Sequence, residues 1–137
     1  MKLKEVQEDL IQLVVSNMGL DIFFNKVKYH RLGYFRKVNF LVKFFEEKGF
    51  DVEYQIPFSF DRETAEELLD LCNQVLQDHS KAKELLPTMP GFFFGSTGYD
   101  EYYFKDVEEV KNWIKETLLP KFDSLEDNEY IEFSTWY

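Results

Sequence analysis

Apolar residues recur along this chain at two different spacings, and the switch between them limits the folds that the sequence can adopt. The spacing is three or four residues over 3–18, 33–48, 62–76 and 106–119, which is typical of helices with one buried face. Apolar and polar residues alternate over 50–58 and again over 130–136, which indicates half-buried strands. Residues 92–96 are an apolar run that indicates a buried strand. Gly19, Gly49 and Pro120 mark the ends of three of the four helices.

These helices and strands follow one another without a regular β-α-β alternation, so the sequence predicts an α+β fold. We expect about four helices packed on a small, mainly antiparallel sheet of three or four strands. Asp61 is well placed to cap the helix after it, whose first turn is acidic. The 137 residues fit one domain, 1–137, which is long enough to bury a core without disulfide or metal cross-links.

The single cysteine points to a reducing compartment. Cys72 has no partner for an internal disulfide, and the charged amino end does not resemble a secretory signal. No apolar run approaches the roughly 20 residues that a membrane helix needs. We therefore expect a cytosolic protein that does not enter membranes.

Charge is distributed unevenly along the chain. The net charge is −10, which argues against general binding of long nucleic acids. Residues 1–50 nevertheless carry nine Lys and Arg against six Asp and Glu, whereas residues 51–137 carry seven against twenty. No acidic residue lies between Asp21 and Glu46. This basic window could attract either a phosphate ligand or the acidic surface of the protein itself.

Several enzyme classes lack their characteristic residues here. Neither a phosphate-binding P-loop nor a dinucleotide fingerprint is present. His30 and His79 have no second ligand at zinc spacing, and Cys72 lies on the apolar side of a helix, where a thiol is usually inert. We expect no metal, no cofactor and no catalysis. Carboxylates are plentiful, however, so a small hydrolase stays open as a minority hypothesis.

The basic window contains the first candidate for a binding segment, Gly33-Tyr-Phe-Arg-Lys-Val-Asn39. Arg36 can hold a phosphate through two hydrogen bonds, and Lys37 adds a second positive charge. Asn39 can read the edge of a base or a sugar. The alternative is that Arg36 pairs with a carboxylate such as Asp100 and joins two parts of the fold.

The second candidate is the aromatic segment 90–103, in which glycines and hydroxyl residues interrupt the rings. Gly95 permits positive φ and close approach to a ligand, and Ser96 and Thr97 offer hydroxyl and amide groups that suit a phosphate. Phe94 and Tyr99 could stack on a base, as could Trp136 near the carboxyl end. The alternative is a tight turn in which Asp100 caps the last helix and the rings fill the core.

Four blocks of sequence resemble a large family of small phage and prophage proteins. They are Gly33-Tyr-Phe-Arg-Lys-Val-Asn39, the helix segment 66–72, the segment 84–103 with Gly-Phe-Phe-Phe-Gly-Ser-Thr-Gly-Tyr-Asp-Glu-Tyr-Tyr, and the terminal Phe133-Ser-Thr-Trp136. The resemblance makes 33–137 the family core and 1–32 a variable amino-terminal helix and connector. The chain departs from the family pattern at 41–45, where it has Leu-Val and Phe-Phe instead of Ile-His and an aromatic pair with Trp. A role that depends on that histidine does not carry over.

The chain is also similar to anti-CBASS sponge proteins, which bind the cyclic dinucleotide signals of bacterial antiphage defence without cleaving them. That likeness implies a phage-encoded immune-evasion protein in the cytoplasm of a host bacterium. Its ligand would be a signal such as cyclic GMP-AMP. The protein would be a homo-oligomer, with a tetramer expected, and residues of more than one subunit would hold the ligand. The alternative is an acidic phage inhibitor that docks on a basic host or defence protein.

Overall fold

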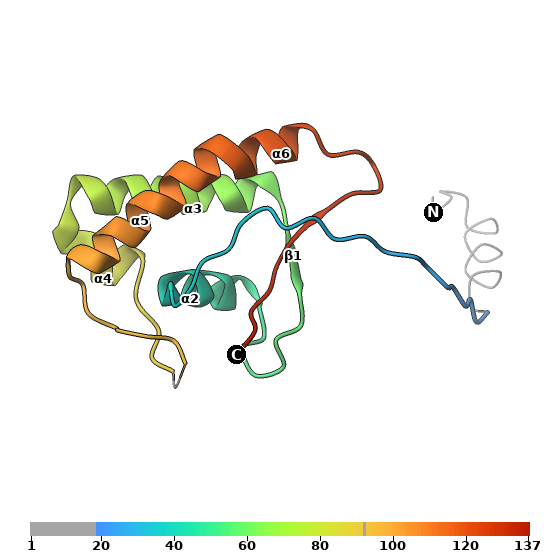
Figure 1. Ribbon diagram of the computed structural model, residues 1–137, viewed down its shortest axis with the longest axis horizontal. Helices are drawn as coiled ribbons and strands as arrows, with labels where there is room; N and C mark the ends of the chain where they lie inside the picture. The colour runs from blue at the N-terminus through green and yellow to red at the C-terminus, as the bar shows by residue number, and fades with distance from the viewer. Residues whose placement is uncertain (1–18, 92) are drawn as a thin grey trace, which may run out of the picture. The chain divides into compact units, whose positions relative to one another are not determined.

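The computed structural model describes residues 19–91 and 93–137 (Figure 1). The chain divides into two units, Met1–His30 and Arg31–Tyr137. In the first unit, residues 19–30 contain no helix or strand and all are exposed. The helix predicted over 3–18 lies outside the described residues.

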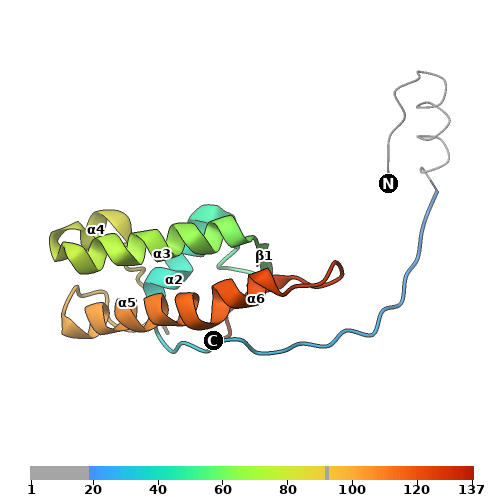
Figure 2. The ribbon, with the colours of Figure 1, turned by 90° about the horizontal axis from the view of Figure 1, so that it is seen from above.

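Two antiparallel helical segments form one layer of Arg31–Tyr137. Helix α3 (Arg62–Gln77) packs along α5 (Glu101–Trp113), and α5 continues through a π-helical turn, η2 (Ile114–Leu118), into α6 (Leu119–Asp123) (Figures 1 and 2). Their facing surfaces supply the centre of the core, which contains Leu68, Cys72, Val75, Val107, Val110, Ile114 and Leu118. Burial of these apolar faces is the main force that holds the layer together.

Helix α2 (Asn39–Lys48) packs its apolar side chains into the same core, and Phe40, Phe44 and Phe45 are all buried. Strand β1 (Phe58–Phe60) pairs antiparallel with β2 (Ile131–Phe133), with Ser59 opposite Glu132. The ring of Phe45 stacks on Phe133 with centroids 4.2 Å apart, which fastens α2 to the sheet. A 3-10 turn, η1 (His79–Lys81), and α4 (Ala82–Leu85) lead away from α3.

Both long helices begin at an aspartate. Asp61 Oδ1 accepts a hydrogen bond from Thr64 N at 2.9 Å, which confirms the predicted cap of α3. Asp100 Oδ1 accepts from Tyr102 N and Tyr103 N, each at 3.1 Å, and starts α5. The last helix therefore begins at Glu101, five residues before the predicted start, and it continues past Pro120. Pro120 lies in the first turn of α6, directly after the π-helical turn η2.

The fold is α+β as predicted, but the described residues contain two strands instead of three or four. The prediction of a strand over 50–58 was wrong for most of its length. Asp51 folds the chain back on itself, because its Oδ1 accepts from Tyr54 N at 3.0 Å and its carbonyl from Gln55 N at 2.8 Å. Gln55 then adopts a φ of 54°. Tyr54 and Ile56 are consequently exposed to solvent.

The strand predicted over 92–96 is also absent from residues 93–96, and Phe92 lies outside the described residues. Gly95 has a φ of 84°, which no strand residue adopts. The helix predicted over 33–48 begins six residues late, at Asn39. Lys37 has a φ of 60°, so a helix cannot pass through it. These two residues with positive φ, Lys37 and Gly95, pack against each other.

Candidate functional site

The two candidate segments lie against each other in the structure. A Cβ built on Gly95 would be 3.0 Å from the Cβ of Lys37, so the Lys37 side chain packs directly over the glycine. Both residues have positive φ, which lets the two backbones approach closely. Lys37, which follows Arg36 in the chain, therefore lies close to Gly95, which precedes Ser96. We call Arg36, Lys37, Ser96, Thr97 and Trp136 the loop surface.

The cationic side of the loop surface is held in place by Trp113 of α5. Trp113 Nε1 donates to the carbonyl of Leu32 at 2.9 Å, and Phe35 packs edge-on against the indole with centroids 5.3 Å apart. Gly33 fits beside the indole because it has no Cβ; a Cβ at this position would be only 2.6 Å from the ring. This anchoring keeps 32–38 out of α2 and leaves Arg36 and Lys37 exposed.

Neither Arg36 nor Lys37 forms an ion pair with any residue in the described ranges. The alternative partner, Asp100, accepts hydrogen bonds from the first turn of α5. The pairing of Arg36 with Asp100 is thus not formed. Both cations are available to an anion that arrives from solvent.

Asn39 is the buried link between the two segments. Its Nδ2 donates to the carbonyls of Phe94 at 3.0 Å and Ser96 at 2.8 Å, and its Oδ1 accepts from Met89 N at 3.1 Å. The side chain is 4% exposed. Its amide therefore holds the loop in shape instead of facing a base or sugar, which was the predicted role.

The turn beside the cations is compact. Ser96 Oγ accepts from Gly98 N at 3.1 Å, and Thr88 Oγ1 donates to the carbonyl of Thr97 at 2.9 Å. Ser96 and Thr97 are both exposed. They present hydroxyl groups within two residues of the contact between Lys37 and Gly95.

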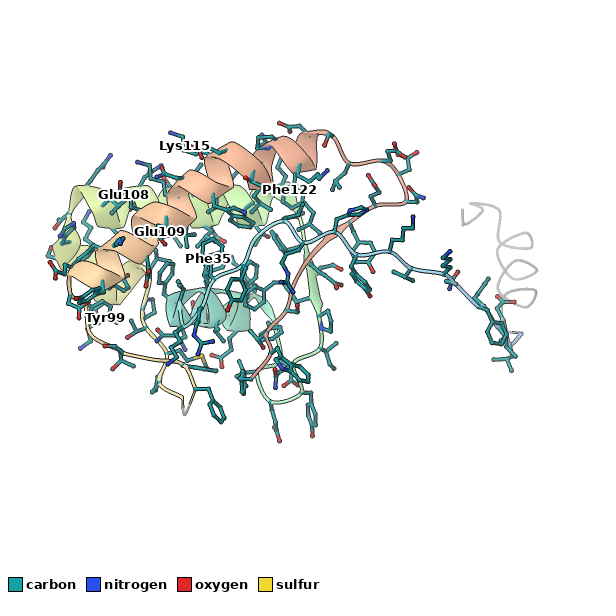
Figure 3. The ribbon with its side chains drawn as sticks, viewed as in Figure 1. Phe35, Tyr99, Glu108, Glu109, Lys115 and Phe122 are labelled. Carbon is teal, nitrogen blue, oxygen red and sulfur yellow. The ribbon has the colours of Figure 1, made fainter. Side chains whose placement is uncertain are left out.

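The three predicted stacking residues differ in how far they are exposed. Phe94 is buried and packs against Gly91 and the ring of Tyr137, so it has no free face. Tyr99 is half-buried, and its hydroxyl accepts from Thr88 N at 3.1 Å (labelled in Figure 3). Trp136, by contrast, is 96% exposed. Of the three, only Trp136 could stack on a base without rearrangement.

Tyr137, which follows Trp136 in the chain, packs against the loop. Its hydroxyl donates to the carbonyl of Val52 at 2.8 Å, and its ring lies 5.1 Å from that of Phe94 between centroids. Sequence reasoning missed this residue, as it missed Thr88. Neither carries a recognisable local signal, because both act through partners that are distant in the sequence.

Two observations bear on the chemistry of the titratable side chains in the described residues. No three His, Cys, Asp or Glu side chains in residues 19–91 and 93–137 could together hold a metal ion. Burial raises the pKa of the Cys72 thiol to about 12, so this group stays protonated, as expected of an inert core residue. Burial also raises the pKa of Tyr103, whose hydroxyl donates to the Leu86 carbonyl at 2.7 Å.

Two hollows lie away from the loop surface. One is between α2 and α3, and the other runs beside β1; none of the nine predicted ligand residues lines either of them. The loop surface is therefore an exposed face, and a ligand bound there would need a second surface to enclose it. Within the described ranges, no helix has the length and apolar character needed to cross a membrane.

A scan of protein-family models, a search of curated proteins and a search of solved structures find no match to this chain.

Proposed function

We propose that this protein binds a small phosphorylated nucleotide at the loop surface and sequesters it without cleavage, with a cyclic dinucleotide such as cyclic GMP-AMP as the leading ligand. The observation that carries the proposal is the packing of Lys37 over Gly95. This contact joins the chain segment that carries Arg36 and Lys37 to the segment that carries Ser96 and Thr97, in a protein whose net charge is −10. A local positive region of this kind suits a compact anion and not a long nucleic acid.

Each residue has a distinct role in this proposal. Arg36 makes charge-assisted hydrogen bonds to one phosphodiester, and Lys37 neutralises it or its neighbour. Ser96 and Thr97 donate hydrogen bonds to phosphate oxygens. Trp136 stacks on a base, because the indole is exposed on both faces.

The resemblance to phage sponge proteins supports a biological setting for such binding. A phage protein that removed a cyclic dinucleotide from the host cytoplasm would keep the signal from its effector. The same resemblance suggests that a second subunit completes the site, which agrees with a loop surface that is open to solvent.

Calorimetric titration with cyclic di-GMP, cyclic di-AMP and cyclic GMP-AMP tests the proposal. We expect at least one to bind, and Arg36→Ala to weaken that binding by about 10-fold to 100-fold, as loss of a charge-assisted contact does. Trp136→Ala should weaken it by about 10-fold. Lys115→Ala is the matched control, because Lys115 is an exposed cation in η2, outside the loop surface (Figure 3).

The state of the bound nucleotide separates a sponge from a hydrolase. Nucleotide released by heating the complex should have its original mass in mass spectrometry. Failure of all three ligands to bind at micromolar protein would contradict the proposal, as would release of a linear product.

The acidic outer faces of α3 and α5 favour a second candidate function. Carboxylates recur there at 63, 66, 67 and 70 and at 101, 108 and 109, all of them exposed, with Glu108 and Glu109 labelled in Figure 3. Such a surface could dock on a basic host protein. If no nucleotide binds, a stoichiometric complex with one basic protein that dissociates in high salt would favour this inhibitor function.

A further inference from the structure

Residues 20–29 form an exposed stretch that is both apolar and basic, which we call the arm. Six large apolar side chains there are from 57% exposed at Val27 to 96% exposed at Phe24. The charged residues are Lys26 and Lys28 against Asp21. Exposed apolar groups at this density are typical of a segment that binds another protein surface.

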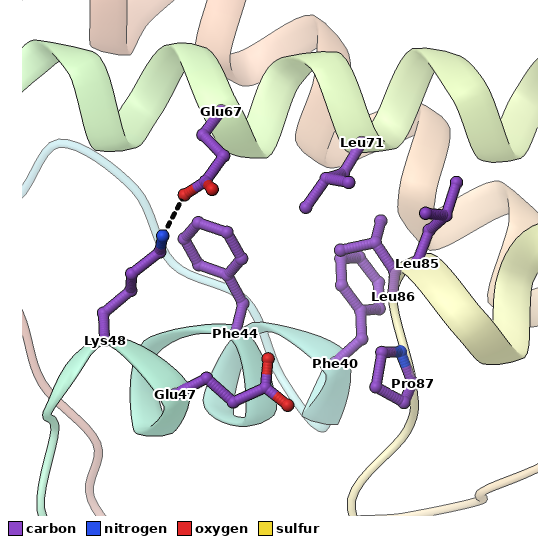
Figure 4. A pocket seen from close by; sticks show the side chains of 9 residues that line it. All are labelled: Phe40, Phe44, Glu47, Lys48, Glu67, Leu71, Leu85, Leu86 and Pro87. Atoms are coloured by element: carbon purple, nitrogen blue, oxygen red, sulfur yellow. Dashed lines mark ion pairs between the residues drawn. The ribbon is translucent and has the colours of Figure 1, made fainter.

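A groove on Arg31–Tyr137 has complementary chemistry. Its first part is the hollow of about 110 Å³ between α2 and α3, with Phe40, Phe44 and Leu71 among its lining (Figure 4). Its second part is the hollow of about 360 Å³ along β1, which Phe58, Ser59 and Phe60 line. Lys48 lines both hollows, so the two parts adjoin at this side chain.

The rim of this groove is acidic. Glu47, Asp61 and Glu67 contribute three carboxylates against the one ammonium of Lys48, which pairs with Glu67 (Figure 4). Apolar side chains of the arm match the floor of the groove, and Lys26 and Lys28 match its rim.

The groove also offers backbone partners. In the described residues β1 pairs with β2 alone, so its other edge is open. Open edges accept an extended segment as an additional strand. Residues 20–29 contain no helix that would have to unfold. In an extended conformation, Leu20, Ile22 and Phe24 would share one apolar face, with Asp21 and Phe23 on the other.

We propose that the arm of one copy docks in the groove of a second copy and that this exchange holds the protein as a dimer or a larger closed assembly. Residues 20–24 add to the open edge of β1, and neighbouring apolar side chains fill the hollow between α2 and α3. Ten extended residues reach about 33 Å, roughly twice the length of a ten-residue helix such as α2, which lines the first part of the groove.

We favour a second copy over an unrelated partner because one chain contains both the arm and the groove that complements it. Two arms exchanged between two identical bodies make two identical contacts, as closed symmetric dimers require. The net charge of each body, with seven Lys and Arg against twenty Asp and Glu over 51–137, favours a basic arm over another acidic surface.

Two measurements on the full chain test this inference. Sedimentation equilibrium should show self-association of the 16.5 kDa chain, and Ile22→Asp with Phe24→Asp should raise the dissociation constant at least about 10-fold. Glu47→Lys, on the rim of the groove, should also raise the dissociation constant. Tyr102→Asp is the matched control, because Tyr102 is 71% exposed in the first turn of α5, outside arm and groove.

The contact itself is located by photo-crosslinking from a benzophenone amino acid placed at residue 24. An equal mixture of ¹⁴N and ¹⁵N protein should give mixed-isotope crosslinks to peptides that contain 40–48, 58–64 or 85–87. A monomer at all concentrations would overturn the inference, as would crosslinks within single chains only or mixed crosslinks outside these peptides. Because no nucleotide is present in either measurement, the outcome is independent of the proposed ligand.

Discussion

At the scale of single residues, two buried side chains, Asn39 and Cys72, act on this molecule in different ways. Asn39 is the one buried polar or charged residue in the described part of the chain, and all three of its hydrogen bonds go to the backbone of 89–96. Cys72 lies in the apolar core between α3 and α5. Asn39 therefore determines the shape of the loop 89–96, whereas Cys72 packs in the core.

Asn39→Ala should lower the free energy of unfolding by about 3 kcal/mol, because backbone groups of Met89, Phe94 and Ser96 would lose their hydrogen-bond partner. Urea denaturation measures the change. The matched control is Asn112→Ala, at an exposed position in α5, which should alter stability by less than about 0.5 kcal/mol. Equal effects of the two substitutions would show that the loop does not depend on Asn39.

Cys72 should not react with Ellman's reagent at pH 8 in the folded protein and should react fully in denaturant, since burial raises the pKa of its thiol to about 12. The unfolded thiol has the ordinary pKa of 9.0 and loses its proton near that pH, whereas the folded thiol keeps it. Stability should therefore fall as pH rises from 9 towards 12, by at most about 1.4 kcal/mol per pH unit from this group. Cys72→Ala should show a shallower fall, and rapid labelling of the native thiol would contradict the assignment.

At the scale of elements, the exposure of Arg36 and Lys37 depends on where α2 begins. The periodicity of 33–48 is helical throughout, yet helix forms only from Asn39. Trp113 holds Leu32, Gly33 and Phe35 against α5, and this contact outweighs local helix propensity. The displaced segment is the one that presents Arg36 and Lys37.

Gly33→Ala should release this segment, because the added Cβ would be 2.6 Å from the indole of Trp113. We expect a loss of about 2 kcal/mol in the free energy of unfolding, as overpacking usually causes, with a change in Trp fluorescence. Gly19→Ala is the matched control, since its Cβ would have no atom within 4 Å. Unchanged fluorescence and stability in Gly33→Ala would mean that 32–35 is not anchored by Trp113.

At the scale of the whole molecule, the described core and the exposed arm lie in different parts of the chain. Every buried apolar residue in the described ranges lies between Val38 and Ile131. The arm adds none of them, and its own apolar side chains stay exposed. The unit Arg31–Tyr137 thus contains the core, and residues 20–29 are free for contacts between copies.

After deletion of residues 1–30, Arg31–Tyr137 should still unfold in one cooperative transition. Its circular dichroism should still show the helices α2 to α6. We expect its free energy of unfolding to stay within about 1 kcal/mol of the value for the full chain when both are measured as monomers. Loss of cooperative unfolding would show that residues 1–30 are part of the core.

Local sequence patterns were sufficient to predict the α+β class, the buried faces of α3 and α5, the cap at Asp61 and the inert character of Cys72. Each depends on residues close together in the sequence, and the local contacts of these residues are the same in the folded protein. The same patterns singled out Arg36, Lys37, Ser96, Thr97 and Trp136, although they could not show which of these residues are exposed together.

Long-range contacts decided the rest of the fold and of the candidate site. They make loops of 33–38 and 93–96, turn Asn39 into a structural link, and place Trp136 beside the loop through Tyr137. The hydrogen bond from Asn39 to Phe94 joins residues 55 positions apart. A local pattern cannot encode such a contact, because its energy depends on the whole chain having already folded around it.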